Sequence, residues 1–159
     1  MSYPPFQRAR QHKHVDITTG NYTLAASQTT SARLTSGPAI VLSNVQVGDV
    51  LLATISGIAS AGTSGEAAFD AASIVSSSIQ SQFSLGTRPI GLGFVQTTTA
   101  GPITGTSSHT IVAGDIDTSG LVTVEITYQH TGSSTGTLFA NATYALRFGV
   151  VNIGPQDLT

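Results

Sequence analysis

The stretch formed by residues 121–153 constrains the fold of this chain more than any other part of it. In its first half, apolar side chains alternate strictly with polar ones, and several of them are β-branched. The apolar positions are Val122, Val124, Ile126 and Tyr128, and the polar positions between them are Thr123, Glu125 and Thr127. This period of two predicts a strand with one face in a core and the other in water.

The second half of the stretch repeats the alternation after a linker rich in Gly, Ser and Thr at residues 131–137. Its apolar positions are Leu138, Ala140, Ala142, Tyr144, Leu146, Phe148 and Val150. Two alternating segments joined by a short polar linker predict a β-hairpin. The dry faces of this hairpin need a second sheet to cover them, so we expect two layers.

The rest of the chain also indicates an all-β fold, because short apolar runs recur between turn residues and no segment carries helix caps. We expect strands at residues 15–18, 21–26, 39–43, 50–56, 66–75, 79–85 and 108–112, an irregular strand or loop at 89–95, and a long surface loop at 97–107. The alanines of 66–75 favour a helix. Glu66 and Asp70 are like charges four residues apart, however, and this spacing weakens a helix. The prediction is a β-sandwich or barrel, and within that class a jelly roll over residues 15–155 with a polar tail at 156–159.

The surface of this fold should be rich in hydroxyls and poor in charge. Only 9% of the residues are charged, against about 25% in ordinary soluble domains. Such a surface suits a protein that works inside an assembly, because few charges must be desolvated when subunits meet. The regular apolar alternation argues against low-complexity disorder.

The first 14 residues differ from the rest and predict an extended N-terminal arm. They contain two consecutive prolines and three basic residues, Arg8, Arg10 and Lys13, whereas the remainder has three Arg against eight acids. We expect Phe6 and the three basic residues to bind a partner, with Phe6 as an apolar anchor on a neighbouring subunit or an acidic shell. A frayed terminus is the alternative. Nucleic-acid binding has little support, because no aromatic residues are interleaved with the basic ones.

Several chemistries are excluded or unsupported by the sequence. The absence of Cys excludes disulfides, thiolate catalysis and Cys-based metal sites. No apolar run approaches the ~18 residues of a membrane span, and the start lacks the apolar centre of a secretory signal. We therefore expect synthesis in the cytoplasm and no membrane partner. There is no phosphate-binding loop and no Gly-x-Ser-x-Gly elbow, so we expect neither a cofactor nor an enzyme.

The histidines are weak candidates for a site. His12 and His14 have a spacing that can hold a metal on an extended chain, but the arm offers no third ligand, and we predict no metal site. His109 and His130 are isolated in the sequence. We expect them to be partly exposed polar residues, with His130 at the edge of a loop.

The acidic residues offer two pairs. Asp115 and Asp117 lie close together in GDIDTSG, which lacks the spacing of a calcium loop. We predict that they cap turns by accepting backbone N–H groups. Glu66 and Asp70 could form a glycosidase carboxylate pair, but no third polar group supports this.

One segment echoes another. Residues 45–50 read VQVGDV and residues 111–116 read IVAGDI, and a long alternating segment follows each. Two interpretations remain open. The echo marks two equivalent corners of a sandwich, or it is a chance repeat of Gly-Asp, a common turn dipeptide.

Five segments carry a resemblance to a known class of proteins. They are VGDVLLATISG at 47–57, FDAASIVS at 69–76, IVAGDI at 111–116, LFANATYAL at 138–146 and VNIGP at 151–155. With them the chain resembles small virion proteins of tailed bacteriophages, especially those that infect actinobacteria. The resemblance covers most of residues 40–155 and implies strand for 67–75. It implies a jelly-roll module, often trimeric, that decorates the capsid or sits on the tail.

From the composition and this resemblance we expect a non-enzymatic structural protein on the virion surface. The leading hypothesis is a capsid decoration protein that binds the major capsid protein as a homotrimer, with loops 58–66, 97–107 and 131–137 facing outward. The alternative is a tail protein, a tail-tip or receptor-binding module that recognises a host cell-surface glycan. A hydrolase on the same scaffold would need a pocket that joins His109 or His130 to a carboxylate.

Overall fold

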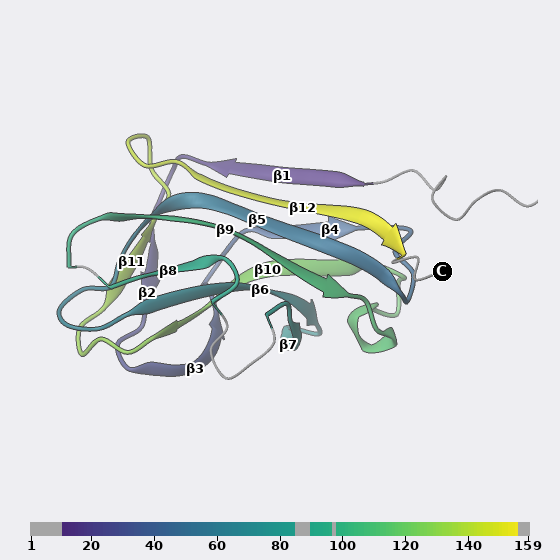
Figure 1. Ribbon diagram of the computed structural model, residues 1–159, viewed down its shortest axis with the longest axis horizontal. Coiled ribbons are helices and arrows are strands. Elements are labelled where there is room, and N and C mark those ends of the chain that lie inside the picture. Colours follow the sequence, from purple (N-terminus) through teal and green to yellow (C-terminus); the bar gives the residue numbers. More distant parts are fainter. Residues whose placement is uncertain (1–10, 85–89, 97, 156–159) are drawn as a thin grey trace, which may run out of the picture.

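The computed structural model describes residues 11–84, 90–96 and 98–155, and these residues form an all-β sandwich (Figure 1). Apart from one short 3-10 helix, η2 (Ala113–Asp115), its regular elements are strands, and every strand pair in the described residues is antiparallel. The strands are β1 (His12–Ile17), β2 (Tyr22–Leu24), β3 (Gln28–Arg33), β4 (Ala39–Leu42), β5 (Asp49–Ser60), β6 (Ala67–Val75), β7 (Ser78–Gln82), β8 (Gly93–Val95), β9 (Gly101–Thr110), β10 (Val122–His130), β11 (Gly136–Phe139) and β12 (Leu146–Pro155). The predicted all-β sandwich is confirmed, whereas its jelly-roll topology stays a prediction.

The first sheet is built around β5, the longest strand. β9 pairs with β5 along almost its whole length on one edge. The other edge takes β12 beside the first part of β5 and β11 beside the last part. β1 continues the sheet beyond β12, and β2 continues it beyond β11.

The second sheet is built around β10 and β6, which pair with each other over residues 123–130 and 67–74. The outer edge of β10 takes β3 and β4, and the outer edge of β6 takes β7 and β8. Strands that share one edge can be counted as one interrupted strand. The chain order then gives four antiparallel pairs that are nested inside one another: β1 with β12, β3/β4 with β10, β5 with β9, and β6 with β7/β8.

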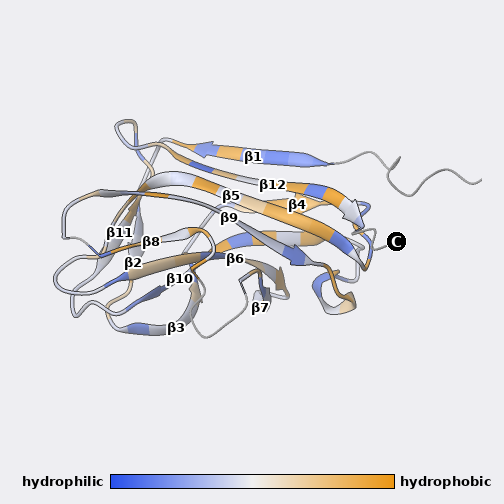
Figure 2. Cartoon of the chain, viewed as in Figure 1, coloured by the Kyte–Doolittle hydropathy of each residue, from blue (hydrophilic) through white to orange (hydrophobic). Residues whose placement is uncertain are grey.

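The core lies between the two sheets and is made by alternate residues of the long strands. Leu51, Ala53 and Ile55 of β5 are buried, and the register places Phe69 of β6 opposite Tyr128 of β10. Figure 2 shows hydrophobic residues recurring along β5, β10 and β12, while β1 is mostly hydrophilic. The predicted inward positions of β10, namely Val122, Val124, Ile126 and Tyr128, are all buried, so this part of the pattern is confirmed.

The predicted hairpin of residues 121–153 is wrong. β10 lies in the second sheet, whereas β11 and β12 lie in the first and pair with β5. The linker at 131–135 therefore crosses from one layer to the other. The second alternating segment is also interrupted at residues 140–145, where the Asn141 Oδ1 atom accepts the N–H groups of Thr143 and Tyr144. Tyr144, a predicted core residue, is 39% exposed.

Other expectations about individual segments were corrected or confirmed. The predicted wet face of β10 is covered, because Glu125 and Thr127 are buried. Residues 101–107 of the predicted loop belong to β9, and β3 was not predicted at all. The choice of strand for residues 66–75 is confirmed by β6, in which residues 67–74 are buried on both faces.

The predicted arm overlaps the sandwich at its end. β1 begins at His12, and His12, Lys13 and His14 pair with Val151, Val150 and Gly149 of β12. Residues 1–10 and the tail at 156–159 lie outside the described residues, and Phe6, Arg8 and Arg10 lie there with them.

Candidate functional site

A groove runs along the side of the molecule where both sheets end. It has a volume of about 520 Å³ and is lined by His12, Lys13, His14 and Val15 of β1 and by Ala39, Ile40 and Val41 of β4. β1 and β4 are both paired on one side only among the described residues. This edge groove is therefore a place where another chain has access to strand edges.

Lys13, one of the predicted partner-binding residues, spans this edge groove. Its Nζ atom donates a hydrogen bond of 2.6 Å to the carbonyl oxygen of Val41. Nearby, the amide of Gln11 donates to Ser43 Oγ (2.8 Å) and accepts from the Ser43 backbone N–H (3.0 Å). These contacts hold the edges of the two sheets together. A charged side chain that points inward from an edge strand also hinders the addition of a further strand.

His12 and His14 remain exposed on β1, with ring centroids 5.7 Å apart. Within the described residues, no group of three or more His, Asp or Glu side chains is placed to hold a metal ion.

The two echoing segments form the same local structure and lie against each other. Asp49 and Asp115 each accept a hydrogen bond from the backbone N–H three residues earlier, that of Gln46 (3.0 Å) and of Val112 (2.9 Å). Each aspartate N–H in turn donates to the carbonyl oxygen of that same residue. The corners are joined by the hydrogen bond from Gly48 N to Ile111 O, of 2.9 Å. The interpretation as equivalent corners is therefore favoured over a chance repeat.

The two predicted turn caps are confirmed. Asp115 caps its own corner, and Asp117 Oδ1 accepts the N–H groups of Ser119 (2.8 Å) and Leu121 (3.0 Å). Aspartate favours such positions because its short carboxylate reaches nearby backbone donors.

Asp115 also joins a Ser and a His, although not in the order that catalysis requires. Its carboxylate accepts from Ser73 Oγ (2.5 Å) and contacts His109 Nε2 (2.8 Å), while the His109 ring stacks on Phe83. Burial would raise the pKa of Asp115, but the hydrogen bonds of Ser73, Val112, Ser81 and His109 outweigh it and hold the pKa below its usual value. In a nucleophilic triad the imidazole lies between Ser and Asp. Here the Asp115 carboxylate lies between Ser73 and His109, so the imidazole does not contact the hydroxyl. The cluster instead links β6, which carries Ser73, to β9, which carries His109.

Asp70 forms a second buried polar cluster, at the stretch of β6 between its β8 partners and its β7 partners. Its carboxylate accepts hydrogen bonds from the backbone N–H (2.9 Å) and the hydroxyl (3.0 Å) of Ser84. The Ser84 Oγ atom also lies 3.3 Å from Ser107 Oγ. Burial dominates here and raises the pKa of Asp70, although the hydrogen bonds of Ser84, Ala71 and Ser107 act in the other direction.

Glu66 and Asp70 do not form a carboxylate pair of the glycosidase type. Four residues along an extended strand span about 13 Å, beyond the roughly 5–9.5 Å between glycosidase carboxylates. Glu66 instead accepts a hydrogen bond of 2.7 Å from Gln96 Nε2.

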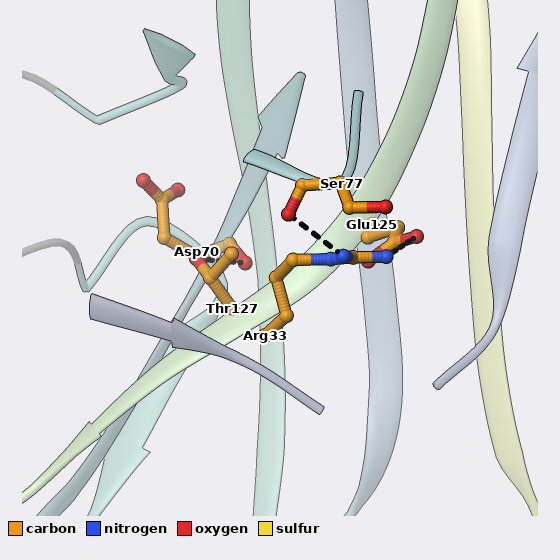
Figure 3. A network of polar contacts seen from close by, with 5 residues as sticks. All are labelled: Arg33, Asp70, Ser77, Glu125 and Thr127. Atoms are coloured by element: carbon orange, nitrogen blue, oxygen red, sulfur yellow. Dashed lines mark hydrogen bonds and ion pairs between the residues drawn. The ribbon is translucent and has the colours of Figure 1, made fainter. Parts of the chain in front are cut away.

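A third polar group covers the outer face of the second sheet (Figure 3). Arg33 of β3 makes a two-pronged ion pair with Glu125 of β10, with N–O distances of 2.7 and 2.8 Å, and also donates to the Ser77 carbonyl oxygen at 2.9 Å. Thr127 donates to the Asp70 carbonyl oxygen beside it. These bonds explain how polar residues at the predicted wet positions of β10 are buried.

His130, expected at a loop edge, is instead completely buried at the far end of β10. Its Nδ1 lies 2.9 Å from the carbonyl oxygen of Ala25, and its Nε2 lies 2.5 Å from that of Ala61. The imidazole thus links the ends of three strands. The sequence carried no signal for this role, because all its partners are distant in the chain.

Comparison with protein families and with curated proteins identified no relative of this chain. No protein-family model matches the chain, and no curated protein matches it. In the described residues, no helix combines the length and apolar character that crossing a bilayer requires. The class that the fold defines is an antiparallel β-sandwich, with polar clusters that hold its strands and an accessible groove at its edge.

Proposed function

We propose that this protein is a non-enzymatic structural component of a bacteriophage particle, a jelly-roll module that assembles as a trimer and decorates the capsid surface. The observation that carries the proposal is the nesting of the strand pairs. A chain whose strands pair first with last, and so on inward, behaves as one long ribbon. When this ribbon is wound so that successive pairs fall alternately in two sheets, the result is a double Greek key, the architecture of many viral capsid proteins.

The pairs of this chain alternate in that way. The pair of β1 with β12 and the pair of β5 with β9 belong to the first sheet. The pair of β3/β4 with β10 and the pair of β6 with β7/β8 belong to the second. This order supports the jelly roll over other two-layer topologies.

The outer face of the first sheet supports a role in assembly. Thr104, Thr106, Ser108 and Thr110 point outward from β9 and are exposed, and the register places Thr106 beside exposed Thr54 of β5. Hydroxyls lose less hydration energy than charges when a partner covers them. A module of this kind would act mechanically, by bridging capsid subunits and resisting internal pressure.

The proposal is tested by the oligomeric state and by the place of the protein on the particle. Light scattering of the purified protein at micromolar concentration should give the mass of a trimer, and a monomer would refute the assembly. Immunogold labelling of particles should show many copies spread over the capsid. Label confined to the tail tip would favour the glycan-binding alternative instead.

A further inference from the structure

Three exposed apolar side chains gather at the end of the sandwich where the two Gly-Asp corners meet. They are Val47, Val112 and Ile153, which are 61%, 50% and 40% exposed. Val47 and Val112 adjoin Gly48 and Ile111, the residues whose backbones are hydrogen-bonded. Ile153 follows Asn152, whose side chain donates to Asp49 at the base of the first corner. We call Val47, Val112 and Ile153 the corner patch.

A cavity of about 200 Å³ adjoins the corner patch and is lined by Val50, Ser108, Thr110, Ile153, Gly154 and Pro155. Its volume exceeds the roughly 150 Å³ that accommodates a benzene molecule in a protein interior. Its lining combines the apolar side chains of Val50, Ile153 and Pro155 with the hydroxyls of Ser108 and Thr110, and such a mixed surface can take an aromatic side chain.

The chain enters the sandwich beside the corner patch. The carbonyl oxygen of Gln11 accepts the N–H of Asn152 at 2.8 Å, and Ile153 is the next residue. The ten residues before Gln11 contain the sequence YPPF at 3–6, and they carry Arg8 and Arg10. Asp117 at this end of the sandwich is partly exposed, so one carboxylate is available there to attract the basic segment.

The sequence between Phe6 and Gln11 bears on whether Phe6 binds the corner patch of its own chain or that of another copy. Residues 7–10 read QRAR and include none of Gly, Pro, Asn, Asp or Ser, the residue types that form turns. Five extended residues reach about 17 Å. A segment that continues the direction of β1 for this distance leads away from its own patch, since a return would need a reversal within residues 7–10.

We propose that residues 3–6 of a second copy of this chain bind the corner patch, with the Phe6 ring in the adjoining cavity. This inference rests on the proposed homo-oligomer. It adds the contact that would hold the copies together, an exchange of N-terminal arms. It also assigns different roles to two residues of the predicted arm. Lys13 bonds within its own sandwich, whereas Phe6 binds a neighbouring copy.

The test uses the absence of tryptophan from the chain. In the Phe6→Trp variant of the full chain, the single indole should emit at short wavelength and resist quenching by acrylamide at concentrations where light scattering gives an oligomer. Dilution to the monomer should shift the emission to that of an exposed indole. Adding Val112→Asp and Ile153→Asp should expose the indole at any concentration, while Phe94→Asp, at an apolar residue of similar exposure on β8, should leave the emission unchanged. A Gln7→Trp control should be exposed throughout.

The outcomes separate this inference from the proposed function. An exposed indole in a protein that is still an oligomer would overturn the arm exchange and leave the trimer intact. A buried indole that persists in the diluted monomer would assign the segment to its own chain and overturn the exchange. A monomer at all concentrations would refute the trimer and the exchange together.

Discussion

The two buried aspartates of the sandwich, Asp115 and Asp70, have similar surroundings and opposite electrostatic behaviour. Both side chains are fully buried, and both accept hydrogen bonds from a serine hydroxyl and a backbone N–H. Both clusters also involve β6, through Ser73 in one case and Asp70 itself in the other. Yet the pKa of Asp115 is held below its usual value, and that of Asp70 is raised above it.

The difference shows that hydrogen bonds alone do not decide the charge state of a buried carboxyl group. Asp115 has an imidazole partner in His109 in addition to its hydroxyl and backbone donors, and together they outweigh its burial. At Asp70 burial is the larger effect, and the donors only reduce it. We infer that Asp115 stabilises the folded protein as an anion, whereas Asp70 costs stability when it is ionised.

The largest effect should come from removing the first carboxylate. Asp115→Ala leaves the Ser73 hydroxyl and the Val112 N–H without their acceptor in a buried site, and we expect a loss of about 3 kcal/mol in the free energy of unfolding. Urea unfolding at pH 7 measures this loss. The matched control is Asp117→Asn, whose side-chain oxygen can still accept both N–H groups that now bond to Asp117 Oδ1, so it should unfold like the parent protein.

The Asp115 variant should also respond differently to acid. Because the folded-state pKa of Asp115 is lowered, its contribution is complete above its unfolded-state pKa of about 4 and is lost as the pH falls through the folded-state value. The gap between parent and variant should therefore narrow toward low pH. A gap that stays constant from pH 7 to pH 2 would mean that the charge of Asp115 has no part in stability.

A smaller effect of the opposite sign is expected at the second carboxylate. In Asp70→Asn the amide can accept the Ser84 N–H and donate to the Ser84 hydroxyl, and it carries no charge to bury. We expect the free energy of unfolding at pH 7 to rise by about 1 kcal/mol or less, because the cost of burying a charge is removed while both hydrogen bonds remain.

The pH dependence identifies the cause of this gain. Because the folded-state pKa of Asp70 is raised, its favourable contribution is complete below about pH 4 and is lost as the pH rises through the folded-state value. The higher free energy of unfolding of Asp70→Asn should therefore appear only at pH values above the folded-state pKa of Asp70, toward neutral pH. A variant that is less stable than the parent at pH 7 would contradict the contrast between the two aspartates.

The contrast also marks what sequence reasoning can reach. The caps at Asp115 and Asp117 were predicted because they are local, within a few residues of a turn dipeptide. The partners Ser73 and His109 were not predicted, since they come from other strands. The burial of Asp70 was missed for the same reason. Its position in a strand was predicted, but nothing local indicated that β6 would be covered on both faces.

The same limit applies to the fold. Alternation identified β10 and its inward residues, because a period of two follows from strand geometry alone. It could not show whether the next alternating segment returns beside β10 or crosses to the other sheet. That choice depends on pairing with β5, whose paired residues lie 77 to 106 positions earlier in the chain. Tyr144 was misassigned to the core because the turn between β11 and β12 happens to preserve the alternating pattern.

The smallest expected effect concerns His109, the last of the donors that lower the pKa of Asp115 and one with no counterpart among the donors to Asp70. His109→Gln keeps a donor that can reach the Asp115 carboxylate but loses the ring stacked on Phe83, and the His109 side chain is 15% exposed. We expect a loss of about 1 kcal/mol or less at pH 7. The pKa of Asp115 should move toward its usual value, and the midpoint of acid unfolding should therefore move to higher pH. His12→Gln, on the exposed part of β1, should change neither quantity. If His109→Gln left the acid midpoint unchanged, the hydroxyl and backbone donors would suffice to keep Asp115 ionised, and His109 would not account for the difference between the two aspartates.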